Sequence, residues 1–233
     1  MRLWLGVDVE TTGLSSTNDR ITELGAVLWD LETNRPIDLF NSLVYTDHQI
    51  SELITKLTGI DREMLDKYGR PEDECLDKFL SMAKDAECIV AHNAPFDRGF
   101  IEESIKRTEG TVPDWKWVDS QRDIPYPETI KGRKLVHLAA EHDFLNPFAH
   151  RALFDVLTMM RVVSQYSPDE ILYFNESPTI HLRAMVNFDG KELAKARGYR
   201  WEAQKKWWVK TIKEFQKPQE LTDLPFEVKE VKL

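Results

Sequence analysis

The feature that most constrains this 233-residue chain is an alternating segment at residues 3–10 that ends in two acids. Apolar side chains there occupy every second position, which predicts a β-strand with Asp8 and Glu10 on the same face. Two carboxylates this close at the end of an apolar strand repel each other and resist desolvation. Mg²⁺ or Mn²⁺, which prefer hard oxygen ligands, would relieve that conflict. Two solvated acids at a strand end are the plainer alternative, and for these two residues alone we favour it.

The segments that follow predict an α/β domain. Residues 21–31 and 37–45 have the composition of strands, and the Asn and Pro between them favour a hairpin. The first three strands should therefore form an antiparallel meander. The apolar run at residues 88–91 predicts a buried parallel strand, and residues 115–119 are a fifth strand candidate. The strongest helical periodicity covers residues 151–166.

The pattern changes near residue 176, so we expect a domain over residues 1–176 and a small α+β module over residues 177–233. The module favours a strand at residues 180–188, a short helix and a hairpin over residues 199–212. Between residues 190 and 217 nine Lys and Arg face three acids, although the whole chain has a net charge of −9. The module is therefore locally basic.

Three of the seven tryptophans of the chain lie within eight residues of this module. We favour the interpretation that they form the core of a very small domain. The alternative is a platform for single-stranded nucleic acid, which combines stacking on aromatic rings with a lysine surface. Both can hold, because alternate residues of a hairpin face opposite sides. The candidate contacts of such a platform are Lys205, Lys206, Trp207, Trp208 and Lys210.

Bulk properties exclude several classes of protein. No apolar stretch approaches the roughly 20 residues that span a bilayer, and the first strand begins almost at Met1, which leaves no room for a signal peptide. We therefore expect a cytoplasmic protein without a membrane partner. Cys75 and Cys88 lack a metal-site spacing and are expected to be reduced core residues. The glycine-rich and nucleophile motifs of other enzyme classes are missing, and no small-molecule organic cofactor is expected.

Three further acids or bases fall at the ends of predicted elements. Asp97 lies in the first turn of the helix after residues 88–91, and His150 and Asp155 flank the start of the strongest helix. Five helical residues turn through about 500°, so His150 must precede the helix if both side chains face the strand end. Taken alone, Asp97 is better explained by the helix dipole and His150 as a cap or surface residue. Asp155 is harder to dismiss, because burying an unpaired carboxylate is costly.

Together these residues lie in segments that resemble a known family. The segments DVETTGL, HNAPFDRGF and HRALFDV, in this order and at these separations, resemble the motifs of the DEDDh 3′–5′ exonucleases. That family includes the proofreading subunit of bacterial DNA polymerase III and RNase T. The resemblance covers about residues 2–166 and implies a ribonuclease-H-like fold, a mixed five-stranded sheet flanked by helices. It also implies a 3′–5′ exonuclease that releases nucleoside monophosphates from single-stranded ends, with DNA favoured over RNA.

The resemblance also assigns roles to individual residues. It implies that Asp8, Glu10 and Asp155 hold the divalent metal ion, Mg²⁺ or Mn²⁺, that activates water. Asp8 would also bind a second ion, where Asp97 acts largely through water. Two such cations clamp the attacking and leaving oxygens of a phosphoryl displacement. His150 would be the general base, a role that an unperturbed histidine pKa of about 6.5 suits near neutral pH. The positions matching those that line the terminal nucleotide are Thr11, Thr12, Thr58, Ile60, His92, Asn93 and Phe96.

The chain departs from the family pattern in two places. Polymerase-associated relatives often carry His at the position of Thr58, so this position does not support pairing with a replicative polymerase. The basic, tryptophan-rich module replaces a short polymerase-binding peptide and resembles C-terminal segments of some phage and bacterial exonucleases, which leaves a protein partner open. An exoribonuclease and an inactive nucleic-acid-binding member of the fold remain as alternatives. The complete set of acids and His150 argues against the inactive protein, which has no chemical need for all of them.

Overall fold

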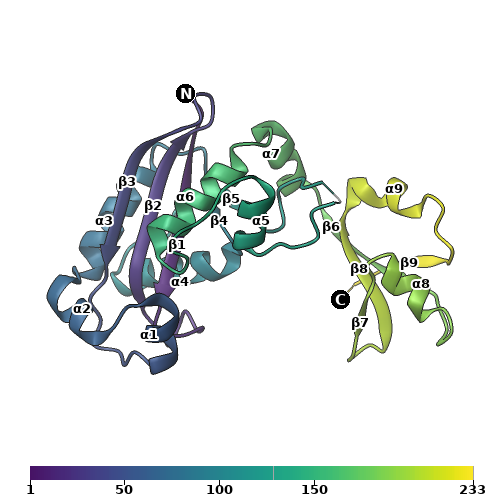
Figure 1. Cartoon of the computed structure of the whole chain (residues 1–233), viewed down its shortest axis with the longest axis horizontal. Coiled ribbons are helices and arrows are strands. Elements are labelled where there is room, and N and C mark those ends of the chain that lie inside the picture. Colours follow the sequence, from purple (N-terminus) through teal and green to yellow (C-terminus); the bar gives the residue numbers. More distant parts are fainter. Residues whose placement is uncertain (128, 233) are drawn as a thin grey trace. The chain divides into compact units, whose positions relative to one another are not determined.

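The computed structural model describes residues 1–127 and 129–232 and divides into two compact units, Met1–Asn175 and Glu176–Leu233 (Figure 1). This division lies one residue from the boundary expected from the sequence. That the units are independent domains stays a prediction. The predicted α/β organisation of the first unit, with a second small sheet in the C-terminal unit, is confirmed.

The first unit is built on a mixed five-stranded sheet with the strand order β3-β2-β1-β4-β5. β1, β2 and β3 pair in an antiparallel manner, whereas β4 and β5 extend the sheet in parallel with β1. The predicted meander and the buried parallel strand are therefore confirmed. The bounds of the strands are β1 Leu3–Thr11, β2 Ile21–Asp30, β3 Arg35–Leu43, β4 Cys88–Ala91 and β5 Trp117–Asp119.

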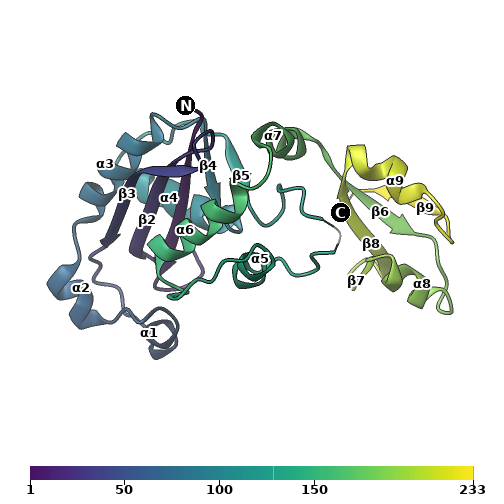
Figure 2. The ribbon, with the colours of Figure 1, turned by 45° about the horizontal axis from the view of Figure 1, so that its top comes forward.

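Helices cover both faces of this sheet (Figures 1 and 2). α3 and α4 pack with one set of strand side chains into the first hydrophobic core. α5, α6 and α7 pack with the alternate set, which includes Trp4, into a second core on the opposite face. The helices are α1 Glu52–Thr58, α2 Arg62–Tyr68, α3 Glu72–Ala83, α4 Ala94–Arg107, α5 Leu135–Glu141, α6 Ala152–Val163 and α7 Pro168–Glu176.

Two glycines allow α6 to approach the sheet closely. A Cβ atom on Gly6 of β1 would lie 2.6 Å from the side chain of Met160. A Cβ atom on Gly25 of β2 would lie 2.6 Å from backbone atoms of Ala152 and Leu153, where α6 begins. Any larger residue at Gly25 would therefore displace the first turn of α6 from the sheet.

The second unit contains a four-stranded sheet with the order β7-β8-β6-β9. A small core lies beneath it, with Leu182, Ala194 and Tyr199 at its centre. The predicted hairpin is present, but the strand expected over residues 180–188 ends at Ala184, and α9 and β9 were not predicted. The elements are β6 Thr179–Ala184, α8 Lys191–Ala196, β7 Arg200–Glu202, β8 Trp207–Lys213, the 3₁₀ turn Glu214–Gln216, α9 Lys217–Leu221 and β9 Val228–Val231.

Two further expectations from the sequence concern the burial of the cysteines and the lengths of the helices. Cys75 and Cys88 are both buried and free, as expected for reduced core residues. Across residues 1–127 and 129–232, every helix is too short or too polar to cross a membrane.

Candidate active site

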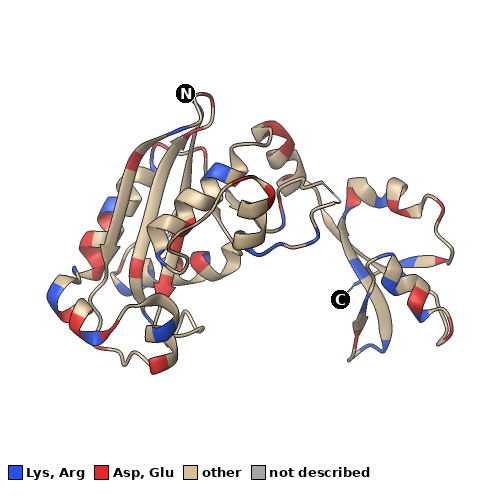
Figure 3. Ribbon diagram, viewed as in Figure 1, with Lys and Arg blue, Asp and Glu red and all other residues tan. Residues whose placement is uncertain are grey.

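A group of three carboxylates forms where β1 ends beside the first turn of α6. Asp8 and Glu10 project from the face of β1 that α6 covers, and Asp155 lies in the first turn of that helix. One carboxylate oxygen from each of the three side chains lies within 4.8 Å of the others. Figure 3 shows the acidic positions of β1 and β2 in red. The strand alternation and the close approach of α6 therefore bring together three carboxylates that could hold a cation, from residues up to 147 positions apart.

An ion pair between a buried glutamate and a half-buried arginine holds the start of α6 against the sheet. Glu23 of β2 is fully buried, and its carboxylate pairs with the guanidinium of Arg151 at 2.8 Å. The same carboxylate accepts the backbone N–H of Ala152 at 3.0 Å. Asp155 in turn accepts the side-chain amide of Asn146 at 2.8 Å and the N–H of Arg151 at 3.1 Å. Sequence reasoning missed this support, although a glutamate within the apolar β2 segment was a signal for it.

Asp97 reaches the same strand end from the opposite face of the sheet. It lies in the first turn of α4, is 2% exposed, and its Oδ1 accepts the backbone N–H of Val9 at 3.1 Å. Within the part of the chain that the structure describes, Asp97 lies outside the group of three carboxylates. It is thus held next to the site by the backbone of β1.

His150 lies outside α6, as the helical geometry requires. Its backbone has a φ of 63°, in the turn before the helix begins at Ala152. The side chain is exposed and lines the same cleft as Asp8, Glu10 and Asp155. The positive φ turns the chain between Pro147 and α6, so the histidine and Asp155 can share one site despite their spacing.

The electrostatics of the site favour a bound cation. Burial, with repulsion from Asp155 and Glu23, raises the pKa of Glu10 to about 8. Burial, followed by repulsion from Asp97 and Glu10, raises the pKa of Asp8 well above its ordinary value. Burial likewise raises the pKa of Asp97 to about 8 and raises the pKa of Asp155. A divalent cation among these oxygens would offset the repulsion, so the donor set fits Mg²⁺ or Mn²⁺.

The carboxylates lie in a cleft of about 600 Å³. Its remaining walls come from the segment after β1, from α1, from the β4–α4 turn and from the start of α5. Sequence reasoning missed several of the residues in these walls, namely Leu14, Leu57, Gln121 and Lys134, because nothing in their local pattern separates a wall residue from any surface residue. The predicted nucleotide-binding residues that line the cleft are Thr11, Thr58, His92 and Phe96.

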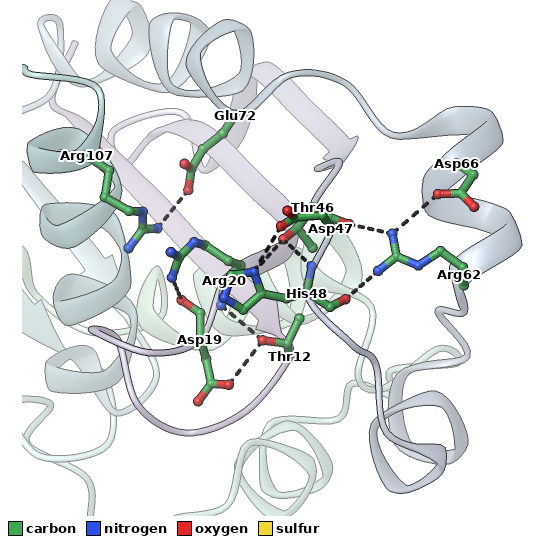
Figure 4. A network of polar contacts seen from close by, with 10 residues as sticks. All are labelled: Thr12, Asp19, Arg20, Thr46, Asp47, His48, Arg62, Asp66, Glu72 and Arg107. Carbon is green, nitrogen blue, oxygen red and sulfur yellow. Dashed lines mark hydrogen bonds and ion pairs between the residues drawn. The ribbon is translucent and has the colours of Figure 1, made fainter.

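Thr12, Ile60 and Asn93 are not among the residues that line this cleft. Thr12 lies in a polar network of the loop after β1 (Figure 4). Its hydroxyl donates to Asp19 Oδ1 at 3.2 Å and accepts the N–H of Arg20 at 3.0 Å. The hydroxyl therefore shapes the loop rather than facing the cleft.

Ile60 and Asn93 support the walls through their backbones. The Ile60 side chain is fully buried, and its N–H donates to the hydroxyl of Thr58 at 3.0 Å. The Asn93 N–H donates to Asp119 Oδ1 at 3.0 Å, and its φ of 73° starts α4. Both residues thus position neighbours that do line the cleft.

His92 lines the cleft with a ring that Ser120 holds in place. Its Nδ1 lies 2.9 Å from the Ser120 hydroxyl, whereas its buried Nε2 has no hydrogen-bond partner among the described residues. Burial lowers the pKa of His92, which favours the neutral ring. Ser120 therefore holds the His92 ring at the wall of the cleft.

The predicted nucleic-acid contacts of the second unit do not all lie on one surface. Lys205 places its Nζ 5.6 Å from the centre of the Trp207 ring. Lys210 instead pairs with Glu220 at 2.5 Å and lines a different hollow. The residues of the predicted platform that line one cleft are Lys206, Trp207 and Trp208.

Comparisons with known proteins agree with this geometry. A family model described as Exonuclease (RNase_T) matches residues 5–163, and one described as a domain of unknown function (DUF8626) matches residues 180–231. The PolC-type DNA polymerase III of Caldanaerobacter subterraneus is 39% identical over 148 residues, which are 64% of this chain and 10% of that protein. The chain thus spans about a tenth of the length of the curated relatives it matches.

Solved structures show the same fold. Escherichia coli exonuclease I in complex with a dT13 oligonucleotide matches with a TM-score of 0.64 and 18% identity, over 82% of this chain and 50% of that one. The nuclease domain of 3′hExo, a DEDDh family member bound to rAMP, matches with a TM-score of 0.58 and 17% identity, over 70% and 90% of the two chains. The expected ribonuclease-H-like fold is therefore confirmed. The chain belongs to the exonuclease family, with the DEDDh exonucleases among its structural neighbours.

Proposed function

We propose that this chain is a metal-dependent 3′–5′ exonuclease that removes nucleoside monophosphates from single-stranded DNA ends. The observation that carries the proposal is the group formed by Asp8, Glu10 and Asp155, whose carboxylate oxygens lie within 4.8 Å of one another. This group lies in a cleft that His150 also lines. The alternative of an inactive member of the fold has no use for a set of mutually repelling buried acids.

In this proposal Asp8, Glu10 and Asp155 hold one divalent cation. Asp8 would also hold a second cation, near which Asp97 would act largely through water. Once bound, such cations neutralise the carboxylates, lower the pKa of bound water and stabilise the charge that develops on the phosphate. Mg²⁺ and Mn²⁺ are favoured because every donor in the group is a hard carboxylate oxygen.

The residues around the acids have separate tasks. His150 accepts the proton of the attacking water, since its imidazole is exposed in the cleft that the carboxylates line. Asn146 and the N–H of Arg151 hold the Asp155 carboxylate in one orientation. Thr11, Thr58, Phe96 and His92 line the space for the terminal nucleotide, where the ring of Phe96 offers a stacking surface.

DNA is the proposed substrate because the curated relatives are DNA polymerases and exonuclease I binds a dT13 oligonucleotide. An RNA substrate is the second candidate, favoured by the 3′hExo neighbour with bound rAMP. The 2′-hydroxyl that separates the two must be read by contacts within the cleft. Pairing with a protein partner through the second unit is a further proposal; the family model that matches this unit describes a domain of unknown function.

The proposal is tested with single-stranded DNA and RNA of one sequence, labelled at the 5′ end. With Mg²⁺ we expect a ladder of labelled DNA shortened one nucleotide at a time, and no products in EDTA. The Asp155→Asn protein, in which one oxygen donor becomes an amide, should give no ladder. Products cut internally, or hydrolysis in EDTA, would contradict the proposal, and a faster ladder on RNA would assign the exoribonuclease activity.

A further inference from the structure

The second unit contains its own cleft of about 570 Å³. It lies between the loop after β6 and the β7–β8 hairpin, and its lining combines aromatic rings with cationic side chains. No Asp or Glu lines it in the described part of the unit. The cleft is therefore electropositive in a chain whose net charge is −9.

The aromatic lining is larger than a small core requires. Trp208 packs against the core of the unit, which explains its presence by structure alone. Phe188 and Trp201 do not belong to that core, and they are 78% and 51% exposed. Trp207 also lies outside the core and lines the cleft. The rings of Phe188 and Trp201 are thus both exposed in the lining of one cleft, and such apolar patches often mark a binding site.

The cations of the cleft form no close ion pair among the described residues, although the charge of Lys191 contributes to lowering the pKa of Glu192. No ion pair joins Arg183, Lys191 or Lys206 to a carboxylate in the ranges 1–127 and 129–232. Lysines elsewhere in the unit do form such pairs, as Lys195 does with Glu192. Figure 3 shows the basic positions along the β7–β8 hairpin in blue.

Two of these cations lie over rings of the same cleft. The guanidinium carbon of Arg183 is 4.4 Å from the centre of the Trp207 ring, and the Nζ of Lys191 is 3.8 Å from that of Phe188. Each ring therefore has a positive charge next to it. The Nε1 of Trp207 and the Nε of Arg183 are buried without a hydrogen-bond partner among the described residues. A cleft that combines aromatic rings with cations offers surfaces for both the bases and the phosphates of a single strand.

We infer that this cleft binds single-stranded nucleic acid, with bases stacking on Phe188 and Trp201 and phosphates contacting Arg183, Lys191 and Lys206. Unpaired bases expose their faces to such rings, whereas the bases of a duplex stack on each other. The choice of a nucleic acid over another polyanion rests on the proposed exonuclease function. A second contact on the same chain would raise the effective concentration of the substrate strand.

The test measures binding without hydrolysis. The full chain in EDTA is titrated into a fluorescein-labelled oligothymidylate while anisotropy is recorded. Phe188→Leu keeps an apolar side chain but removes the ring, so Kd should rise at least about fivefold. Phe215→Leu, in the same unit but outside the cleft, is the matched control and should leave Kd unchanged.

Charge is tested by Lys191→Gln, matched to Lys217→Gln on α9, which lies outside the cleft. The first variant should weaken binding and reduce the slope of log K against log salt by about 0.7, and the second should do neither. Because Phe188 and Lys191 lie outside the core, both variants should keep the thermal unfolding curve of the parent chain.

Several results would overturn the inference. An unchanged Kd in both cleft variants would show that the cleft does not bind the oligonucleotide. Equal affinity for duplex DNA would show that bases do not stack on its rings. If the cleft bound polyglutamate more tightly than the oligonucleotide, its ligand would be an acidic protein rather than a nucleic acid. These outcomes are independent of the proposed function, because an inactive chain can still bind and an active chain can hydrolyse without this cleft.

Discussion

Replacing Glu10 by Gln is expected to stabilise the metal-free protein. Burial, together with the carboxylates of Asp155 and Glu23, raises the pKa of Glu10 to about 8 from an ordinary 4.5. An acid whose pKa is higher in the folded state binds more protons there than in the unfolded chain. The folded state therefore loses stability as pH rises between the two values. The penalty is absent below about pH 4 and complete above about pH 8.

The raised pKa of Glu10 and the repulsion between neighbouring carboxylates both indicate the size of this penalty. At pH 7 the group lies about 2.5 pH units above its ordinary pKa, which corresponds to about 3 kcal/mol. Two charges 4.8 Å apart at an effective dielectric constant of about 20 repel by about 3 kcal/mol. Gln keeps the shape of Glu10 but loses the attraction to Arg151, so we expect a gain of about 1–3 kcal/mol. For a unit of this size the midpoint temperature should rise by about 2–12 °C.

The assay is thermal unfolding of the full chain in EDTA at pH 5 and pH 8, followed by circular dichroism. Glu10→Gln should unfold at a higher temperature at pH 8, and the difference should shrink towards pH 5. Adding Mg²⁺ should raise the midpoint of the parent chain more than that of the variant, because the variant lacks one donor oxygen. A midpoint at pH 8 that is equal to or below that of the parent chain would refute this account of the site.

Four further predictions test other parts of the structure. His150→Ala should lower turnover by about 10²–10⁴ with unchanged Mg²⁺ affinity in calorimetry, and lost affinity would show that His150 is a ligand. Gly25→Ala should destabilise the fold by about 1–3 kcal/mol in denaturant unfolding and reduce hydrolysis, because its Cβ would meet the first turn of α6; parent-like values would show that α6 does not pack so closely. Arg151→Met leaves Glu23 buried without its charged partner, so a loss of about 3–5 kcal/mol is expected, and a neutral result would show that the pair does not hold α6. A chain ending at residue 175 should remain folded by circular dichroism and hydrolyse single-stranded DNA, whereas an insoluble product would contradict two independent domains.

Much of the first unit could be predicted because its elements have strong local patterns. The alternation before Asp8, the apolar run of β4 and the periodicity of α6 each follow from where the side chains are buried. The second unit was harder to predict. β9 is four residues long, two of them exposed, and it exists through pairing with β6 nearly 50 residues earlier. Long-range pairing of this kind leaves no local signal in a short polar segment.

The residues of the candidate site also fall into those that the sequence predicts and those that it does not. Asp8, Glu10 and Asp155 were predicted because their residue type and position leave few structural explanations. Glu23 was not, because its role depends on the register that places it opposite Glu10 and near the start of α6. In the second unit, the number of lysines did not predict which of them line the cleft. Lys210 forms an ion pair with Glu220, whereas Lys191, which was not singled out from the sequence, lines the cleft.

The central claim is that Asp8, Glu10 and Asp155 form a metal centre for phosphodiester hydrolysis. Its most direct test is a crystal of the protein grown with Mn²⁺ and thymidine 5′-monophosphate, with anomalous scattering recorded at the manganese edge. The account predicts an anomalous peak in contact with oxygens of all three carboxylates and with the phosphate of the nucleotide. A nucleotide bound in the cleft with no anomalous peak at these carboxylates, or a peak held by other residues, would contradict it.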